Sequence, residues 1–592
     1  MMNSVKLTVL LHVLLPVFSQ DLQEVTISTP LGGLLGLRRR LSSDDVYEFK
    51  NIPFAKAPVD NLRFEKPQPY GSWDNTLDAR HFGPSCFQDM SRSNLKNKNI
   101  SEDCLFLNIY IPHHISTVNT KSVMVWIHGG GNFVGQTQLY DAAYLALAGD
   151  VIVVTIQYRL NIFGFFATGN SKGNYALWDQ ILAIQWVKDN IASYGGNSQS
   201  TTIFGESAGA FDLGLLSIMP QNEGLYQRII LQSGLALAEN GLGTTTHRSS
   251  SQVATNVGCS QSDAGELTQC MKYVDANVLL AELGKLISLG FFQGGSFAPV
   301  IDGELLPTQP KELLRDSQSQ ASRFYKSLDI IIGVTTGEGS LLLDIFLAGV
   351  QNFYNFNATD YIPKRILCNT IAQDIVNVIY NSNTDIASLI CDKYGATLTR
   401  DQLSKNVLNA YSDPIFLISG VESLRLHTGI DSGRQFQYLF SKPTYLLPVI
   451  PRRPEWFDGS AHATELFYFF FIESLPTEQD RELSSNLMKY WTNFAKTGDV
   501  NGVNLPKWEE YDTTTEHYIN FDINITTGQQ MLKDRVDFWL NDIPSILNPA
   551  SSTRRPSIQT SPTNGSHRVY YQQVLLVDSL ILFVVWCFYK SM

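Results

Sequence analysis

The stretch TTIFGESAG, residues 201–209, joins a short run of strand-forming residues to a Gly-x-Ser-x-Gly motif. The run TTIF is typical of a buried strand, and residues 208–218 favour a helix. A sharp turn from strand to helix holds its serine in strained backbone geometry with the hydroxyl exposed. The two glycines leave room for the strand and the helix to approach closely. Ser207 is therefore the candidate nucleophile.

The segment HGGG, residues 128–131, follows another predicted strand at residues 121–128. A glycine run after a strand can turn its backbone amides toward a ligand, because no side chain blocks them. Backbone N–H groups stabilise the oxyanion of acyl transfer without reorganising. We therefore predict an oxyanion hole built from the N–H groups of Gly130, Gly131 and Ala208.

Further strand and helix patterns surround these two motifs. A nearly continuous β-branched run at residues 150–158 is expected for a strand covered on both faces. Residues 174–191 have the apolar spacing of a helix, and residues 228–232 and 328–334 repeat the strand pattern. This alternation predicts an α/β fold, with a central, mostly parallel sheet flanked by helices. Its reactive loops would lie at the carboxyl ends of the strands.

The composition excludes some classes of partner. The chain has 592 residues and a formal net charge of −12. This acidic balance argues against nucleic acid as a partner, because phosphate binding needs a basic footprint. No C-x-x-C motif or His/Cys cluster has the spacing of a zinc site. We therefore predict neither a metal nor a cofactor.

The two ends of the chain carry targeting signals. Residues 1–19 predict a secretory signal peptide, with an N-terminal membrane anchor as the alternative. Residues 20–550 form the predicted catalytic body, and residues 551–573 have the Ser, Thr and Pro content of a linker. The hydrophobic tail at residues 574–592 fits a glycosylphosphatidylinositol-anchor signal, a membrane span or an unprocessed end. We expect a protein that is secreted or held at the extracellular face of the membrane.

Glycosylation sequons at Asn99, Asn357, Asn524 and Asn564 fit the same secretory route. An oxidising compartment also permits disulfides. Six of the seven cysteines fall into three pairs that are close in sequence. Six cysteines allow many connectivities, so the spacing favours local pairing without fixing it.

Several longer segments resemble a known family. Over most of residues 25–540 the chain resembles the type-B carboxylesterase and cholinesterase family of α/β-hydrolases. The matching segments are Asn51–Ala55, Ser101–Ile109, Trp126–Gly131, Tyr158–Leu160, Gly173–Asn174, Leu177–Gln180, Gly205–Ala210 and Leu231–Gly234. The resemblance implies the α/β-hydrolase fold and hydrolysis of small-molecule carboxylic esters.

The resemblance also places the two partners of the serine. Glu338, which follows a predicted strand, matches the triad glutamate of the family, and His462 matches its histidine. The chain order Ser, acid, His agrees. His462 would take the proton of Ser207 and return it to the leaving alcohol, while Glu338 would orient the imidazole during an acyl-enzyme mechanism. Glu206 is similar to a family glutamate beside the nucleophile, and either tunes the electrostatics or is structural.

The same resemblance implies covalent and ionic links within the body. These are the disulfides Cys86–Cys104 and Cys259–Cys270, and structural ion pairs of Arg63 with Glu102 and of Arg159 with Asp179. Cys368 and Cys391 depart from the cholinesterase pattern, whose third bridge is long-range. Their pairing with each other is our hypothesis.

Three other functions stay open as alternatives, namely a cholinesterase, an adhesion protein and a lipase that acts on long-chain lipid. Cholinesterases bind a quaternary ammonium by cation–π attraction to a tryptophan in the loop closed by the first disulfide. Residues 86–104 contain no tryptophan here, which disfavours a dedicated cholinesterase. Esterase-like adhesion proteins share the layout of ectodomain, stalk and membrane segment, but they generally lack a complete triad. The sequence therefore favours a general serine carboxylesterase.

Overall fold

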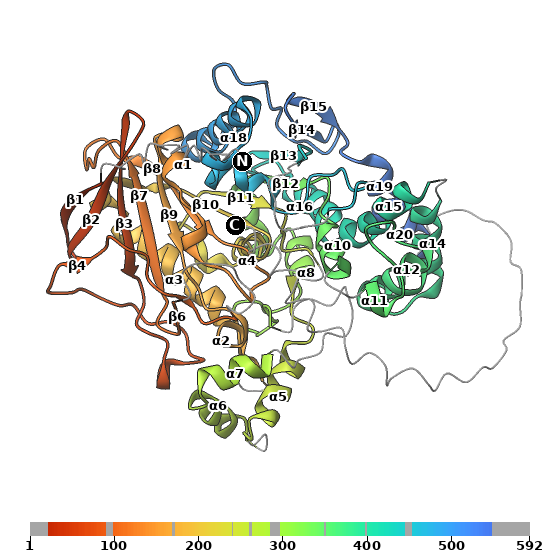
Figure 1. Ribbon diagram of the computed structural model, residues 1–592, viewed down its shortest axis with the longest axis horizontal. Coiled ribbons are helices and arrows are strands. Elements are labelled where there is room, and N and C mark those ends of the chain that lie inside the picture. Colours follow the sequence, from red (N-terminus) through yellow and green to blue (C-terminus); the bar gives the residue numbers. More distant parts are fainter. Residues whose placement is uncertain are drawn as a thin grey trace, which may run out of the picture.

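The computed structural model describes residues 22–89, 99–168, 172–238, 241–259, 263–283, 297–347, 351–396, 399–443 and 453–547. Figure 1 shows a twisted sheet through the middle of the molecule, with a lobe of helices beside one end and a smaller helical group below. The predicted signal peptide, linker and tail lie outside the described residues, as does Asn564.

A mixed sheet of 13 strands organises the described chain. Its main path runs β1 (Leu22–Thr29), β2 (Gly32–Leu41), β3 (Asp44–Pro53), β7 (Phe106–Pro112), β9 (Ile152–Ile156), β8 (Lys121–Ile127), β10 (Gly196–Glu206), β11 (Arg228–Gln232), β12 (Asp329–Thr335), β13 (Gln435–Phe440), β14 (His517–Phe521) and β15 (Thr526–Gln529), with β4 (Leu77–Asp78) beside β2. β5 (Ser85–Cys86) and β6 (Ile100–Ser101) form a separate pair. Neighbours from β9 to β14 are parallel, and the outer pairs of the main path are antiparallel. This confirms the predicted α/β fold.

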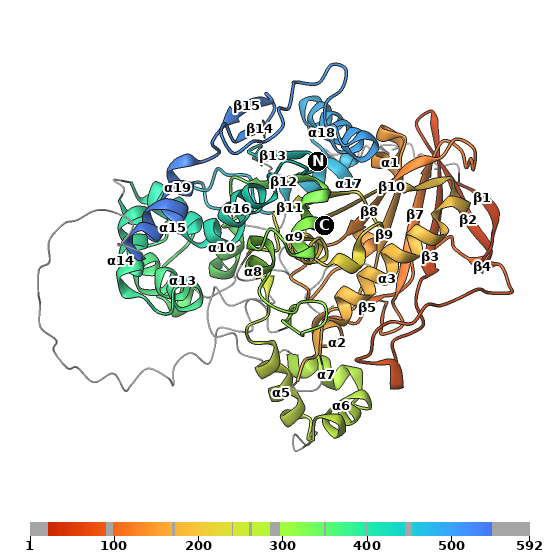
Figure 2. The same ribbon diagram turned by 180° about the vertical axis from the view of Figure 1, so that it is seen from behind.

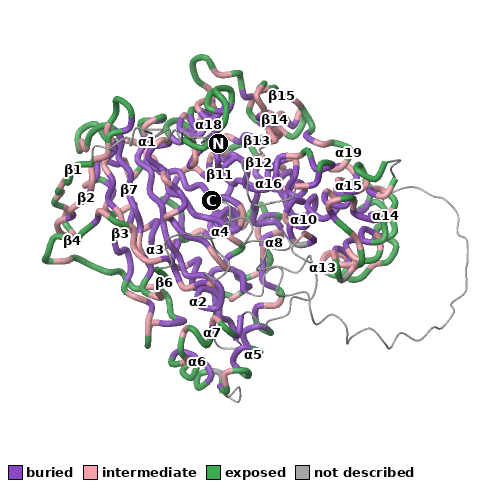
Figure 3. The backbone as a smooth tube through the Cα atoms, viewed as in Figure 1, coloured by how far each residue is buried: buried purple, intermediate pink, exposed green. Residues whose placement is uncertain are grey.

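The central strands are apolar on both faces because both faces are covered. In β8, Val123, Val125 and Ile127 pack into the core on one side of the sheet. Met124 and Trp126 point to the core on the other side. Side chains alternate along a strand, so a strand between two cores reads as a continuous apolar run. Figure 3 shows this buried centre under a more exposed rim.

Helices cover the two faces of the sheet, as the reverse view in Figure 2 shows for α3. α3 (Tyr175–Asn190) and α4 (Ala208–Leu216) pack into the first core, together with α2 (Asn161–Phe165) and α9 (Gln320–Ser327). α1 (Ala143–Gly149), α17 (Phe467–Phe470) and α18 (Glu478–Thr497) pack into the second. None of the described helices combines the length and the apolar character that a membrane crossing requires.

The remaining helices form the two groups that stand beside the sheet in Figure 1. The lower group comprises α5 (Thr246–Asn256), α6 (Ala264–Lys272) and α7 (Ala276–Leu283). The lobe comprises α10 (Ser340–Ile345), α11 (Gln351–Phe353), α12 (Lys364–Ile366), α13 (Ala372–Ile379), α14 (Thr384–Gly395), α15 (Arg400–Ser412), α16 (Ile418–His427), α19 (Lys533–Asp537) and α20 (Ile543–Leu547), with α8 (Pro310–Arg315) between the groups. The lobe has a core of its own. α10 begins two residues after Glu338, so the lobe packs directly behind the predicted acid.

Candidate active site

Ser207 occupies a strained turn between β10 and α4. Its backbone has φ 54° and ψ −125°, a region that non-glycine residues rarely adopt. The Ser207 N–H donates to the Gln232 carbonyl at 2.9 Å, which ties the turn to the end of β11. A Cβ atom on Gly209 would lie 2.7 Å from the His128 carbonyl oxygen, so only glycine fits there. The residue predicted as nucleophile therefore lies at the carboxyl end of a central strand, on a turn that leaves it partly exposed.

The glycine run after β8 lies against this serine. Gly130 and Gly131 have φ values of 116° and 64°, which favour glycine. A Cβ atom on Gly129 would lie 3.0 Å from Ser207 Cβ, so the loop and the serine touch. Ala208 is the first residue of α4, and the first amides of a helix have no acceptor within it. The three predicted oxyanion donors thus come from two segments that flank Ser207.

His462 and Glu338 meet in the loops that follow β13 and β12. The imidazole Nδ1 lies 2.5 Å from Glu338 Oε2. Backbone pairing of Gly337 with Ala461 brings the two loops together, and the His462 N–H donates to Ser340 Oγ at 3.0 Å. Both side chains of the pair are buried. The two residues predicted from widely separated motifs are therefore in direct contact.

The carboxylate of Glu338 is held from two further directions. Ser233 Oγ donates to Glu338 Oε1 at 2.6 Å, and the Thr335 N–H donates to the same oxygen at 2.7 Å. Together with the contact to His462, these hydrogen bonds fix the orientation of the carboxylate. The acid is consequently preorganised to orient the imidazole.

The second nitrogen of the imidazole faces Glu206. His462 Nε2 lies 3.0 Å from Glu206 Oε1. The other oxygen of Glu206 would lie 2.8 Å from a Cβ atom on Gly129, the same point that is 3.0 Å from Ser207 Cβ. Ser207, Glu206 and His462 therefore share one small space. The ring of Phe416 lies 5.2 Å from the imidazole, centroid to centroid, and forms an apolar wall.

Buried carboxyl groups dominate the electrostatics around His462. Burial alone would lower the pKa of His462, but Glu206 and Glu338 more than offset burial and raise that pKa above its ordinary value. Burial raises the pKa of the Glu206 carboxyl and raises the pKa of Glu465 to about 7. Burial also raises the pKa of Asp344, against the opposing charge of His462. The surrounding carboxylates therefore stabilise the protonated, positively charged form of His462.

His128, which begins the glycine run, is a structural residue. Burial lowers its pKa to about 4, so the ring is neutral at physiological pH. Its Nδ1 contacts the Gly129 carbonyl at 2.9 Å, and the Tyr158 hydroxyl donates to the His128 carbonyl at 2.6 Å. These contacts fix the start of the glycine run.

Comparison with known proteins agrees with this geometry. A sequence model described as the carboxylesterase family matches residues 23–539. This chain belongs to the carboxylesterase family. It is 34% identical over 552 residues to carboxylesterase 5A of Mus musculus, covering 87% of this chain and 88% of the relative. It is 32% identical to carboxylesterase 1F of Mus musculus, covering 87% and 93%, and 31% identical to a medium-chain fatty acyl-CoA hydrolase precursor of Anas platyrhynchos, covering 89% and 94%.

Membership of the family makes the chain a carboxylic ester hydrolase of the α/β-hydrolase class. The resemblance to carboxylesterases drawn from the sequence motifs is thereby confirmed. The strained serine, the glycine run and the buried histidine–glutamate pair all lie within residues 23–539, which the family model matches.

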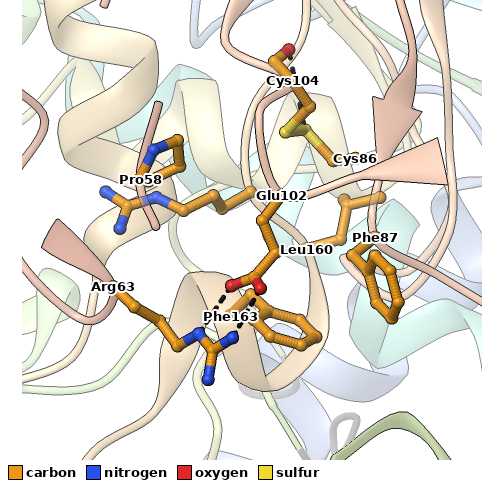
Figure 4. Close-up of a pocket in the computed structure, with 9 residues that line it drawn as sticks. Pro58, Arg63, Cys86, Phe87, Glu102, Cys104, Leu160 and Phe163 are labelled. Carbon is orange, nitrogen blue, oxygen red and sulfur yellow. Dashed lines mark hydrogen bonds and ion pairs between the residues drawn. A yellow bond between two sulfur atoms is a disulfide. The ribbon is translucent and has the colours of Figure 1, made fainter. Parts of the chain in front are cut away.

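Three disulfides cross-link the described part of the carboxylesterase. These are Cys86–Cys104, Cys259–Cys270 and Cys368–Cys391. The first lies beside a small pocket that also contains the ion pair of Arg63 with Glu102, as Figure 4 shows. Arg63 donates to both oxygens of Glu102, at 2.6 and 2.5 Å.

The second ion pair implied by the resemblance also forms in the carboxylesterase. Arg159 donates to both oxygens of Asp179, at 2.8 and 2.7 Å, and both side chains are buried. Charges that are buried together need matched partners, so this pair is structural. Of the predicted glycosylation sites, Asn99, Asn357 and Asn524 are exposed.

Sequence reasoning missed several polar residues near the site. It assigned no role to Glu465, whose Oε1 accepts from Gln232 at 3.3 Å, or to the buried Asp344. It also passed over Asp212 and Asn132, which are hydrogen-bonded to each other. A charged residue within an otherwise apolar predicted segment, such as Asp344 after three leucines, was the available signal.

Proposed function

We propose that this carboxylesterase cleaves esters with a Ser207–His462–Glu338 triad and a backbone oxyanion hole. The 2.5 Å contact between His462 Nδ1 and Glu338 Oε2, beside a strained serine, is the observation that supports the proposal best. Free serine is a weak nucleophile and needs an adjacent base. The raised pKa of His462 makes it a strong base once it has lost its proton.

The proposed reaction has two similar halves. Ser207 Oγ attacks the ester carbonyl carbon while His462 takes the hydroxyl proton, and the carbonyl oxygen becomes an oxyanion held by Gly130, Gly131 and Ala208. The tetrahedral intermediate expels the alcohol, which receives the proton from His462. Water then attacks the acyl-enzyme by the same route and releases the carboxylic acid.

Hydrolysis of p-nitrophenyl butyrate by the full chain tests this proposal. We expect turnover by the wild-type protein and a loss of at least about 1,000-fold in kcat for Ser207→Ala. A fluorophosphonate should label one serine, in the peptide that contains Ser207. Folded protein that shows neither turnover nor labelling would refute the triad, and would favour an adhesion role for the same fold.

The loop closed by the first disulfide supports a general esterase rather than a cholinesterase. Its aromatic residue Phe87 packs edge-on against Phe163, with ring centroids 5.4 Å apart, and so is engaged in the core. We expect butyrylcholine to be hydrolysed with a kcat/KM at least about 10-fold below that of p-nitrophenyl butyrate, because the cation–π contribution is missing. A preference for butyrylcholine would contradict this assignment.

A second substrate class is suggested by one relative. The Anas platyrhynchos protein is named as a medium-chain fatty acyl-CoA hydrolase, and the two chains align over 89% of this one. The proposed mechanism accommodates a thioester, since the thiolate leaves in place of the alkoxide. Release of free thiol from decanoyl-CoA, abolished by Ser207→Ala, would establish this activity, and its absence would restrict the enzyme to oxygen esters.

We also propose that the protein enters the secretory pathway through residues 1–19 and is glycosylated on its body. The three disulfides and the exposed sequons support this location. A shift in mass on treatment with N-glycosidase F is the expected result. Release from intact cells by phosphatidylinositol-specific phospholipase C would identify the tail at residues 574–592 as an anchor signal, and retention would favour a membrane span.

A further inference from the structure

The proposed oxyanion hole takes its donors from two separate segments. Gly130 and Gly131 lie in the loop after β8, whereas Ala208 begins α4. These donors must converge on one oxygen to be useful, and a misplacement of about 1 Å can cost about 100-fold in rate. The close approach of Gly209 to the His128 carbonyl fixes the base of the loop against α4. At the far side of the glycine run the Asn161 N–H donates to the Asn132 carbonyl at 2.7 Å, and the side chain of Asn132 adds a further constraint.

Asp212 supplies that constraint from α4, one helical turn after Ala208. Its Oδ1 accepts from Asn132 Nδ2 at 3.0 Å, and its Oδ2 accepts from Gln180 Nε2 at 2.7 Å. Asn132 directly follows Gly131, and all three side chains of this hydrogen-bonded group are buried. The carboxylate therefore links the glycine run to the helix of the nucleophile.

The side chain of Asn132 depends on this single link. Among the described residues its Nδ2 donates to Asp212, and its buried Oδ1 has no hydrogen-bond partner. The N–H groups of Phe133 and Val134 donate to the Gly130 carbonyl at 3.1 and 3.2 Å, which closes residues 130–134 into a tight turn. Any displacement of Asn132 is consequently transmitted to the amides of the glycine run.

We propose that Asp212 is a positioning residue, which holds the glycine run and the start of α4 in register for oxyanion binding. This inference rests on the oxyanion hole of the proposed function. Burial raises the pKa of Asp212 to about 7, although the two amide donors oppose that rise. A buried carboxyl group destabilises the fold unless it is well hydrogen-bonded. Here the amides of Asn132 and Gln180 supply those hydrogen bonds.

Two single variants of the full chain break the link, and a third serves as a matched control. Asn132→Gly tolerates the positive φ of 62° at this position while it removes the donor. Asp212→Leu keeps the approximate size of the side chain but removes both acceptor oxygens. Gln180→Met removes the other hydrogen bond of the same carboxylate and leaves the glycine run untouched.

We expect both link variants to lower kcat for p-nitrophenyl butyrate by about 10-fold to 100-fold, with KM within about threefold. The Ki of an aryl trifluoromethyl ketone, whose adduct with the serine carries an oxyanion, should rise by the factor that kcat/KM falls. Gln180→Met should lower the thermal midpoint to a similar extent, yet keep kcat within about threefold.

The exchange Asn132→Asp with Asp212→Asn restores an amide–carboxylate pair with donor and acceptor reversed. We expect it to recover at least about 10-fold of the activity that Asn132→Asp alone loses. Folded link variants with wild-type kcat and ketone Ki would overturn the inference, and so would an equal loss of kcat in Gln180→Met. An inactive wild-type protein would instead overturn the proposed function, so the two failures can be told apart.

Discussion

The two nitrogens of His462 face carboxylates in contrasting surroundings. On the Nδ1 side, Glu338 receives hydrogen bonds from Ser233 and Thr335 in addition to the imidazole. On the Nε2 side, Glu206 Oε1 lies 3.0 Å from the ring but accepts no hydrogen bond from the described residues. The hydrogen bonds hold the carboxylate of Glu338 in one orientation, whereas Glu206 acts on the imidazole through its charge. We infer that the Glu338 side orients the base and that the Glu206 side sets its proton affinity.

The largest effect is expected when the contact between Glu338 and Nδ1 of His462 is broken. Glu338→Gln removes the charge that stabilises the imidazolium and presents an amide to Nδ1, which favours the wrong tautomer. We expect kcat for p-nitrophenyl butyrate to fall by about 10,000-fold. Fluorophosphonate labelling should slow by a comparable factor. A loss below about 10-fold would show that Glu338 does not orient the base.

A smaller effect is expected when Glu338 is kept but loses one of the hydrogen bonds that orient it. Ser233→Ala deletes the hydroxyl that donates to Glu338 Oε1 at 2.6 Å. We expect kcat to fall by about 10-fold, corresponding to roughly 1.4 kcal/mol. The measurement is kcat at a saturating concentration of p-nitrophenyl butyrate. The double variant with Glu338→Gln should be no worse than Glu338→Gln alone, because the two residues act as one unit, and additive losses would contradict that coupling.

Replacing Glu206, on the Nε2 side of the imidazole, should change the pH profile of kcat/KM rather than the maximal rate. Glu206 helps to raise the pKa of His462, and the base is active only after it loses its proton. In Glu206→Gln the pKa of His462 falls, so the acid limb of kcat/KM should move to lower pH, by about one unit. Plateau kcat should stay within about 10-fold of wild type. An unshifted acid limb would remove Glu206 from its tuning role.

The smallest effect is expected at Asp344, in the lobe behind the triad. This carboxyl is buried, and His462 is the charged group that acts on it among the described residues. Burial raises its pKa well above the ordinary value, and the charges that raise the pKa of His462 come from Glu206, Glu338 and Glu465. Asp344→Asn should therefore move the acid limb in the same direction as Glu206→Gln, by less than about half a unit. A larger shift than that of Glu206→Gln would reverse the ranking.

Local backbone constraints made the nucleophile and the glycine run predictable from sequence. Ser207 needs glycines on both sides, and the predicted oxyanion loop needs residues without side chains, so both leave a readable pattern. The strands beside them were predicted to within a few residues, except the start of β10. That strand begins at Gly196, five residues before the predicted start at Thr201. The polar residues between these positions carry no apolar alternation, and the pairing with β8 shifts its register there.

Partnerships across the chain were less accessible to sequence reasoning. Asp212 and Asn132 are 80 residues apart, and neither lies in a motif that announces the other. The pairing of Cys368 with Cys391 was a hypothesis until the helices that carry them were seen to lie together. His462 and Glu338 were found through a family resemblance, since a single histidine in a chain of this length has no local signal of its own. Their contact depends on the order of strands, which motifs do not encode.

That strand order affects how the enzyme folds. The triad candidates follow β10, β12 and β13, and the pairing of Gly337 with Ala461 closes a loop of more than 100 residues. Such long closures carry an entropic cost before any contact compensates them, so chains with non-local pairing fold slowly. A partly folded chain cannot assemble the base beside the nucleophile. The first appearance of esterase activity during refolding would therefore report that β10, β12 and β13 have joined and that the loops after them have met.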